Sequence, residues 1–211
     1  MAENPRSLDC LILVDLQNDF MPGGALPVPD GDEVVEVANE LATLFGYVVA
    51  SQDWHPANHL SFASQHAGHR PGDIVEIDGL EQVLWPDHCV QRSPGADFHA
   101  SIDRRRIDAV FRKGLDRNVD SYSAFFDNAR RRSTGLAEHL HRLGIGSVAL
   151  MGLATDYCVK FSALDAVSLG LRTVLIADGC RGIDLSAGDI DRACQEMRSA
   201  GVGIVRAGDF K

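Results

Sequence analysis

The sequence predicts an α/β fold in which helices cover both faces of a mostly parallel sheet. Short apolar runs alternate along the chain with segments whose apolar residues recur at helical spacing, which is typical of β-α units. Residues 8–16 and 148–151 are nearly continuous apolar runs, as expected for strands that are buried on both faces. A length of 211 residues suits one such domain, because single α/β domains commonly reach about 200–250 residues.

The composition is that of an ordinary soluble globular chain, and it argues against several functional classes. Hydrophobic residues make up 45% and charged residues 24%, and the formal net charge of -10 argues against a nucleic-acid-binding face. No apolar run approaches the roughly 20 residues of a membrane span, and Met1–Ser7 lacks the order of a signal peptide. The cysteines are scattered and odd in number, which favours a reducing cytoplasm over a disulfide framework; they are Cys10, Cys89, Cys158, Cys180 and Cys194.

The chain begins with a strand and a helix. The apolar run Leu8–Leu16 predicts a central strand with Asp15 at its C-terminal end. Apolar residues at helical spacing then predict a helix from Asp32 to about Phe45. Asp30 or Asp32 would be the N-cap of this helix, because a short acidic side chain can accept the first free backbone N–H groups.

Tyr47–Ser51 is the second expected strand, and a long excursion follows it. Between Pro56 and Ser101 we find no long periodic segment and expect only short strands, around Ile74–Ile77. Long loops in compact domains are usually either disordered or functional. Clusters of histidine and aromatic residues in this excursion favour a functional loop.

The second half of the chain repeats strands and helices at short intervals. A strand at Ala109–Arg112 ends at Lys113, and another at Val148–Met151 leads into a turn that contains Cys158. A helical pattern follows that turn. The remaining expected elements are the strands Thr173–Ala177 and Gly203–Val205, and the helices Leu136–Leu143 and Ile190–Ala200.

Three chemically distinct side chains stand at strand ends: Asp15, Lys113 and Cys158. Taken singly, each has an ordinary structural interpretation, as a loop cap, a surface charge and a packed thiol. In open α/β sheets, however, ligands bind outside the carboxyl ends of the strands. An acid, a base and a nucleophile at three such ends of one sheet therefore predict an active site.

The chemistry that these groups suit is acyl transfer. A free thiol is mostly protonated at neutral pH, so it needs a base or a cationic neighbour. We expect the helix N-terminus to favour the thiolate of Cys158, Asp15 to take its proton, and Lys113 to offset the resulting charge. Burial would raise the pKa of Asp15 towards that of the thiol. Backbone N–H groups of the turn at Ala154–Cys158 could bind the oxyanion.

A second constellation predicts a metal site beside a flat pocket. Asp53 and three histidines, His55, His59 and His88, offer carboxylate and imidazole ligands that suit zinc, iron or manganese. Surface histidines in a polar loop are the alternative interpretation. The aromatic residues that could line a pocket for a flat ring are Phe20, Trp54, Trp85 and Tyr122, although Trp54 suits core packing equally well.

Six sequence blocks, in the same order, resemble the nicotinamidase branch of the isochorismatase-like cysteine hydrolases over essentially the whole chain. The blocks are Val14–Phe20 (VDLQNDF), Ser51–Pro56 (SQDWHP), Trp85–Val90 (WPDHCV), Phe111–Gly114 (FRKG), Asp120–Phe125 (DSYSAF) and Gly152–Val159 (GLATDYCV). The resemblance implies a three-layer isochorismatase-like hydrolase fold, with residues 1–211 as one domain.

The resemblance also implies a role for each candidate residue. Asp15, Lys113 and Cys158 match the catalytic triad, and the backbone N–H groups of Ala154 and Cys158 match the oxyanion hole. The Leu153–Ala154 peptide matches a bond that is cis in the family. The metal ligands would be Asp53, His55 and His88, with His59 a direct or water-mediated ligand, and the ring-binding residues would be Phe20, Trp85 and Tyr122.

The implied function is hydrolysis of nicotinamide to nicotinate and ammonia, and of pyrazinamide to pyrazinoate, through a cysteine thioester. This would make the chain an amidohydrolase acting on linear amides in NAD salvage, with one divalent ion, for which Zn²⁺ is favoured over Fe²⁺ or Mn²⁺. We expect a small-molecule substrate, no nucleic-acid or membrane partner, a cytoplasmic location, and a monomer or a homo-oligomer.

Four alternatives remain open on the sequence. An N-carbamoylsarcosine-type amidase would keep the triad but has less need of the full metal set. An isochorismatase would lack the nucleophilic cysteine. A silent binding or metal-storage module would release no ammonia, and a zinc-hydroxide hydrolase would tolerate the loss of Cys158.

Overall fold

A six-stranded, wholly parallel sheet forms the centre of the computed structural model, which describes residues 8–211. The strand order is β5-β2-β1-β6-β7-β8, so the order reverses between β1 and β6. This is the doubly wound arrangement expected from the sequence, and helices cover both faces. The strands are β1 (Cys10–Val14), β2 (Val48–Asp53), β5 (Ala109–Lys113), β6 (Ser147–Leu153), β7 (Arg172–Arg181) and β8 (Gly203–Val205).

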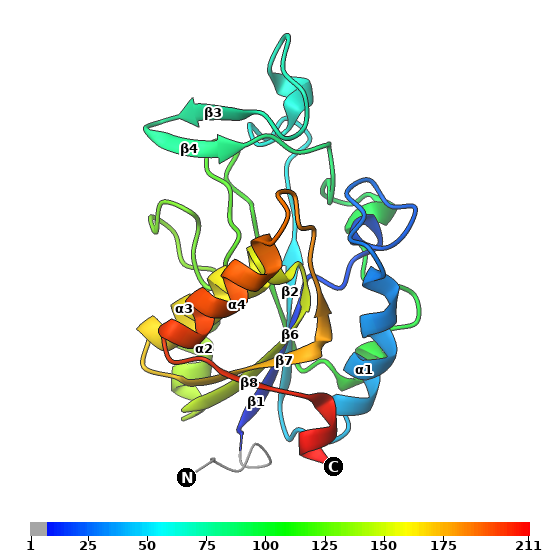
Figure 1. Cartoon of the computed structure of the whole chain (residues 1–211), viewed down its shortest axis with the longest axis vertical. Helices are drawn as coiled ribbons and strands as arrows, with labels where there is room; N and C mark the ends of the chain where they lie inside the picture. Colours follow the sequence, from blue (N-terminus) through cyan, green and yellow to red (C-terminus); the bar gives the residue numbers. More distant parts are fainter. Residues whose placement is uncertain (1–7) are drawn as a thin grey trace.

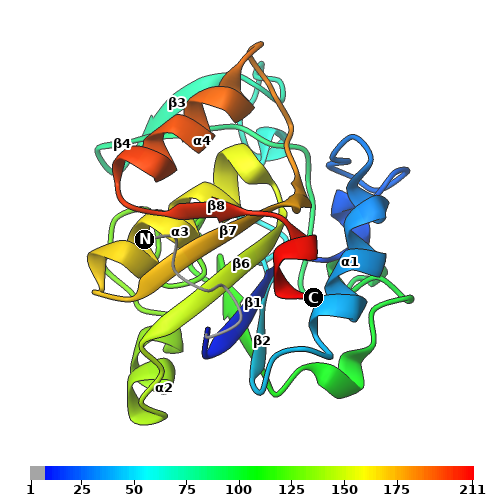
Figure 2. The same ribbon diagram turned by 60° about the horizontal axis from the view of Figure 1, so that its bottom comes forward.

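The helices divide between the two faces of the sheet. Helix α1 (Val34–Leu41) lies on one face, and α3 (Lys160–Ser168) and α4 (Asp189–Ser199) lie on the other, as Figures 1 and 2 show. Helix α2 (Leu136–Arg142) precedes β6. Every residue of β1, β2 and β6 is buried, because these inner strands are covered on both faces.

The excursion after β2 rises beyond the carboxyl ends of the strands, at the top of Figure 1. It contains a two-stranded antiparallel hairpin made of β3 (Ile74–Ile77) and β4 (Leu80–Val83). The first of these strands matches the expected one, and β4 was not expected from the sequence. A parallel bridge between Phe62 and Trp85 joins the segments before and after this hairpin. The excursion is therefore an ordered cover over the end of the sheet where the site residues lie.

Two sequence-based expectations about element boundaries are wrong. Helix α1 begins at Val34 with Glu33 as its N-cap, and Asp30 instead stands before a 3-10 turn without a side-chain cap bond. Strand β7 continues to Arg181, past Ala177, where the strand was expected to end. The register shifts between β6 and β7, since Leu150 pairs with Leu175 but Gly152 pairs with Cys180, so the extra residues of this irregularity lie in β7.

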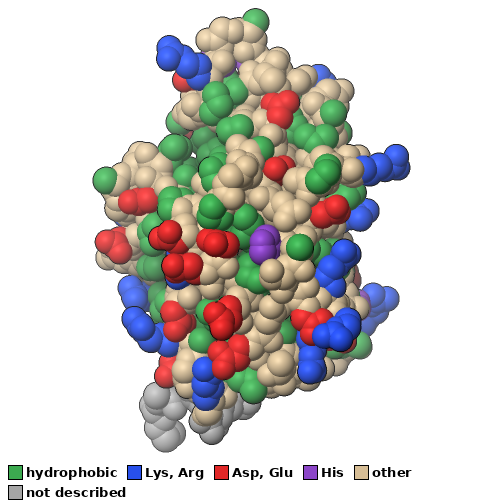
Figure 3. Space-filling view, turned by 90° about the vertical axis from the view of Figure 1, so that its right-hand side faces the viewer, with side chains coloured by type: hydrophobic (Ala, Val, Ile, Leu, Met, Phe, Trp, Pro, Cys, Tyr) green, Lys and Arg blue, Asp and Glu red, His purple; other side chains and the backbone are tan. Residues whose placement is uncertain are grey.

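Charged side chains are spread over the surface. On the face drawn in Figure 3, many acidic side chains gather in the lower left half, and basic side chains lie mostly toward the edges. No helix within residues 8–211 combines the length and apolar character needed to cross a bilayer.

The backbones of β1 and β6 lie very close together where Val14 pairs with Gly152, so this position requires a glycine. This residue has φ 128°, and a Cβ added there would lie 2.2 Å from the carbonyl oxygen of Val14. We expect Gly152→Ala to lower the free energy of unfolding by at least about 2 kcal/mol, because both the backbone conformation and the strand spacing would have to change. Chemical denaturation measures this loss.

Gly46→Ala is the matched control, because a Cβ added at Gly46 would meet nothing within 4 Å and the backbone there has an ordinary conformation. A Gly152→Ala protein as stable as Gly46→Ala would contradict this account of the junction.

Candidate active site

The structure brings the three strand-end residues into direct contact. Asp15 follows β1 with a left-handed backbone (φ 50°), Lys113 is the last residue of β5, and Cys158 lies in a five-residue π-helical turn, Thr155–Val159. The Lys113 Nζ lies 3.0 Å from Asp15 Oδ2 and 3.5 Å from Cys158 Sγ. The three side chains thus form one buried cluster at the carboxyl end of the sheet.

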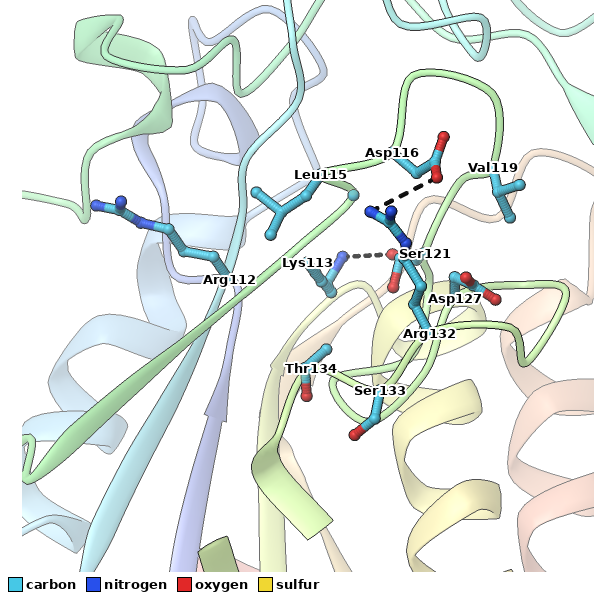
Figure 4. A pocket seen from close by; sticks show the side chains of 11 residues that line it. Arg112, Lys113, Leu115, Asp116, Val119, Ser121, Asp127, Arg132, Ser133 and Thr134 are labelled. Atoms are coloured by element: carbon cyan, nitrogen blue, oxygen red, sulfur yellow. Dashed lines mark hydrogen bonds and ion pairs between the residues drawn. The ribbon is translucent and has the colours of Figure 1, made fainter. Parts of the chain in front are cut away.

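Lys113 is the centre of this cluster. Its Nζ also lies 3.1 Å from Asp53 Oδ1 and donates to the Ser121 carbonyl oxygen at 2.8 Å, a bond drawn in Figure 4. Burial alone would lower the pKa of Lys113, but the carboxylates of Asp15 and Asp53 outweigh it and hold that pKa well above its usual value. Lys113 is therefore a fixed positive charge and not a proton donor.

Asp15 and Cys158 both have raised pKa values. Burial is the largest cause for each, and it is only partly offset by Lys113. Burial and the nearby carboxylates therefore outweigh any preference of the helix N-terminus for the thiolate, and the net effect is a pKa of Cys158 well above its usual value. The Lys113 Nζ contacts Asp15 Oδ2 at 3.0 Å and Cys158 Sγ at 3.5 Å, so the thiol and the carboxyl group share one neighbour.

Asp15 is held by a residue that sequence reasoning missed. The Ser51 hydroxyl donates to Asp15 Oδ1 at 2.7 Å and lies 3.3 Å from the Asp15 backbone nitrogen, which donates to it. This bond favours the ionised carboxylate and lowers the pKa of Asp15. Ser51 directly precedes the Gln52-Asp53 pair, and only the alignment of β1 with β2 reveals its partner.

A second cluster, which we name the metal triad, consists of Asp53, His55 and His88. Asp53 Oδ2 lies 3.0 Å from His55 Nε2 and 3.5 Å from His88 Nε2. The other ring nitrogens contact carbonyl oxygens, His55 Nδ1 with Gly114 at 3.1 Å and His88 Nδ1 with Pro86 at 2.8 Å. A carbonyl can only accept, so each Nδ1 carries a proton and each Nε2 can offer a lone pair.

The chemistry of the pocket fits a divalent cation. The ligand atoms of the metal triad lie within 4.8 Å of one another, and among the described residues the buried His55 Nε2 has its closest polar contact with the Asp53 carboxylate of the same triad. Burial would raise the pKa of Asp53, but His55 and Lys113 hold it well below the usual range, so it is ionised. The pocket contains three buried carboxyl groups, those of Asp15, Asp53 and Asp120, and one buried ammonium, that of Lys113, so a further cation suits it.

His59 lies beside the metal triad. Its ring centroid is 4.3 Å from that of His55, and its Nδ1 lies 2.7 Å from the Ser61 hydroxyl and accepts the Ser61 N–H at 3.1 Å. Burial and the neighbouring His55 lower the pKa of His59 to about 4, so the ring is neutral.

The ring-binding candidates line a small cavity next to Cys158. Phe20, Trp85 and Tyr122 form its wall, and the Trp85 Nε1 donates to the Tyr122 hydroxyl at 3.2 Å. The cavity volume is about 30 Å³, room for roughly two or three waters. The sequence missed further lining residues: Leu26, Asp120, Tyr157 and Ile183.

Two other expectations concern the surroundings of the cavity. Trp54 packs outside it, with the Arg112 guanidinium 3.9 Å above its ring, so its role is structural. Ala154 lines the cavity, and the Leu153–Ala154 peptide is cis, as the resemblance implied.

A separate cavity of about 250 Å³ opens beside Lys113 and Thr134. Figure 4 shows Arg132 reaching across it to Asp116. Neither Cys158 nor any member of the metal triad lines this space, so it is not the reaction pocket.

Comparisons with known proteins agree with this geometry. A family model described as the isochorismatase domain matches residues 9–209. This chain belongs to the isochorismatase family. Nicotinamidase from Escherichia coli (strain K12), one relative, is 52% identical over 211 residues, which covers 98% of this chain and 97% of that protein.

Solved structures of this family superpose closely on the chain. A nicotinamidase/pyrazinamidase from Acinetobacter baumannii is 42% identical with a TM-score of 0.94, covering 99% of this chain and 100% of that one. A pyrazinamidase from Pyrococcus horikoshii, solved in complex with zinc, is 37% identical with a TM-score of 0.77, covering 94% and 98%.

Because Asp15 and Asp53 share the ammonium of Lys113, replacing Lys113 should destabilise the folded protein. In metal-free protein, Lys113→Met leaves Asp15 and Asp53 buried without their counter-charge, and we expect a loss of about 3–5 kcal/mol of unfolding free energy near pH 7. The pKa values of both carboxyl groups would rise in the folded state. As the pH falls, the folded protein would therefore bind these protons at a higher pH than the unfolded chain does. The loss should therefore be smaller near pH 5.

Denaturant titrations at both pH values test this, with Lys160→Met as control because Lys160 pairs with Glu196 nearer the surface. An equal, pH-independent loss in the two variants would refute the account.

Proposed function

We propose that this chain is a nicotinamidase that hydrolyses nicotinamide to nicotinate and ammonia, and pyrazinamide to pyrazinoate. The observation that carries the proposal is the contact of Lys113 with both Asp15 and Cys158, directly beside the metal triad and the aromatic cavity. The names of the high-identity relatives support the same substrate. NAD salvage in the cytoplasm is the metabolic setting that we propose.

Cys158 is the proposed nucleophile, and Asp15 is the proposed general base and acid. The Cys158 thiol transfers its proton to Asp15 as Sγ attacks the carboxamide carbon, so no free thiolate needs to accumulate in the resting enzyme. The fixed charge of Lys113 stabilises Asp15 before the transfer and the developing anion after it. The raised pKa of Asp15 narrows its gap to the thiol and makes the transfer easier.

The remaining steps return the enzyme to its starting state. Charge on the carbonyl oxygen is stabilised by the N–H groups of Ala154 and Cys158. Asp15 gives its proton to the departing nitrogen, which leaves as ammonia, and an acyl thioester remains on Cys158. A water molecule then attacks the thioester with Asp15 as base, nicotinate is released, and the Cys158 thiol regains a proton.

The metal triad is proposed to hold one divalent ion, for which Zn²⁺ is favoured over Fe²⁺ or Mn²⁺. Bound there, the ion would supply Lewis-acid coordination of the ring nitrogen. Phe20, Trp85 and Tyr122 hold the ring by its faces and edges and exclude water from the acyl centre. These three residues would hold the ring on one side of the cavity, and Cys158 lies on the other side. The carboxamide carbon would therefore lie next to Sγ.

The nucleophile is tested by substitution. Cys158→Ala removes the attacking atom, so ammonia release from nicotinamide should fall by at least about a thousandfold. The matched control is Cys180→Ala, because Cys180 is also buried but bonds to Ile176 in β7, away from the cavity. A Cys158→Ala enzyme near the wild-type rate, abolished by a chelator, would instead indicate a metal-hydroxide hydrolase and defeat the proposal.

The base is tested by the pH profile. Ser51→Ala removes a hydrogen bond that favours ionised Asp15, so the pKa of Asp15 should rise. Because the base must be ionised, the acidic limb of kcat/KM should move to higher pH by about one unit, the size expected for a hydrogen bond to a charged group. Ser51→Thr keeps the hydroxyl and should keep the wild-type limb. The role of Asp15 as base is wrong if the alanine variant shows no shift.

A further inference from the structure

Asp156 is a buried carboxylate that the proposed mechanism does not use. It lies in the same π-helical turn as Cys158, two residues before the nucleophile, and is 5% exposed. Its neighbour Tyr157 and Cys158 line the small cavity described above, which we name the reaction cavity, and Asp156 does not. A buried carboxylate is costly unless its oxygens accept hydrogen bonds, so the partners of Asp156 indicate its role.

Both oxygens of Asp156 accept backbone N–H groups from one loop. Oδ1 accepts the Ile183 N–H at 3.0 Å, and Oδ2 accepts the Asp184 N–H at 2.8 Å. These residues belong to loop 182–188, the orange segment that joins β7 to α4 in Figure 1. Successive backbone N–H groups that converge on one anion form a specific binding arrangement. The carboxylate therefore attaches this loop to the turn that carries the nucleophile.

The first residues of the loop are also held from the side of α4. Asp184 has a left-handed backbone (φ 53°), and its Oδ1 accepts the Ile190 N–H at 3.3 Å. A Cβ added at Gly182 would lie 3.0 Å from Asp156 Oδ1 and 2.5 Å from Ile190 Cγ1. The loop thus passes closely between the carboxylate and the start of α4, and this approach leaves no room for a side chain at Gly182.

Ile183 is the residue that this attachment places at the reaction cavity. Its side chain lines the cavity with Phe20 and Leu26, and it packs against the hydrophobic core. An apolar side chain in this wall offers dispersion contacts to a flat pyridine or pyrazine ring. Because the backbone N–H of Ile183 is bonded to Asp156, the position of this wall depends on the nucleophile turn.

We propose that Asp156 is a positioning residue, which holds Ile183 in the wall of the reaction cavity and so sets how tightly the aromatic ring of the substrate is bound. Asp156 shares a rigid turn with Cys158, so one carboxylate fixes the spacing between the apolar wall and the nucleophile. It acts through the backbone of the loop and touches no reacting atom. This inference rests on the proposed function, because it takes the reaction cavity as the site of the ring.

The kinetics of Asp156→Asn test this role. The substitution keeps the side-chain size but replaces one acceptor oxygen with an NH₂ group, so one of the two bonds to the loop is lost. A weakened apolar contact affects the bound substrate and the transition state alike, so the KM for nicotinamide should rise about fivefold while kcat stays within about twofold. Equilibrium binding of nicotinate, measured by calorimetry, should weaken by a similar factor.

Asp189→Asn is the matched control. Asp189 also accepts a backbone N–H of this loop, that of Ser186 at 2.8 Å, but it lies outside the reaction cavity. The KM and the nicotinate affinity of this variant should equal those of the wild type.

A double-mutant cycle shows whether Asp156 acts through Ile183. Ile183→Ala removes the apolar contact itself, and the KM should rise about tenfold. In that background Asp156→Asn should raise the KM by less than about twofold, because the side chain that Asp156 places is already gone. Gly182→Ala moves the loop without altering Asp156, and it should raise the KM in the same way.

The melting temperature of each variant shows whether it folds, and Gly182→Ala decides the matter if Asp156→Asn does not. A wild-type KM in the folded variants overturns the role of Asp156. So does a fall in kcat at unchanged KM, or an undiminished effect in the Ile183→Ala background, since Asp156 would then hold the nucleophile turn and not the wall. A wild type that releases no ammonia from nicotinamide would instead defeat the proposed function.

Discussion

The ammonium of Lys113 is the interaction on which the rest of the site depends. It is completely buried and lies within about hydrogen-bonding distance of carboxylates from two strands, those of Asp15 and Asp53. Each carboxylate would be costly to bury alone, and the shared cation makes both tolerable. One side chain thus joins the proposed catalytic triad to the metal triad, and neither cluster can be rearranged without changing the other.

The parallel sheet allows this contact because neighbouring strands end at the same edge. Asp53 pairs directly with Lys113 across β2 and β5, and Val14 pairs with Gly152 across β1 and β6. The strand order reverses between β1 and β6, which opens the crevice where Asp15 and Cys158 meet. Gly114, with φ 65°, lets the chain leave β5 against His55, since a Cβ there would lie 2.4 Å from the ring.

Burial controls proton positions in the site more strongly than the helix end does. A helix N-terminus stabilises a nearby anion by about 0.3–1 kcal/mol, which is less than one pKa unit. Complete burial can shift a pKa by as much as about 3–5 units. The Cys158 thiol therefore stays protonated until a base takes its proton.

The sequence by itself determined the alternation of strands and helices and the strand ends that carry Asp15, Lys113 and Cys158, because buried parallel strands need continuous apolar runs. The six motif blocks also indicated Asp53, His55 and His88 as ligands, since those residue types suit divalent ions. Only the tertiary structure decided their partners: Ser51 beside Asp15, the backbone of Ile183 beside Asp156, and the proton on His59. These contacts join segments up to tens of residues apart, and local periodicity has no information about distance between such segments. The protonated state of Cys158 was likewise decided by burial, a property of the packed chain and not of its turn.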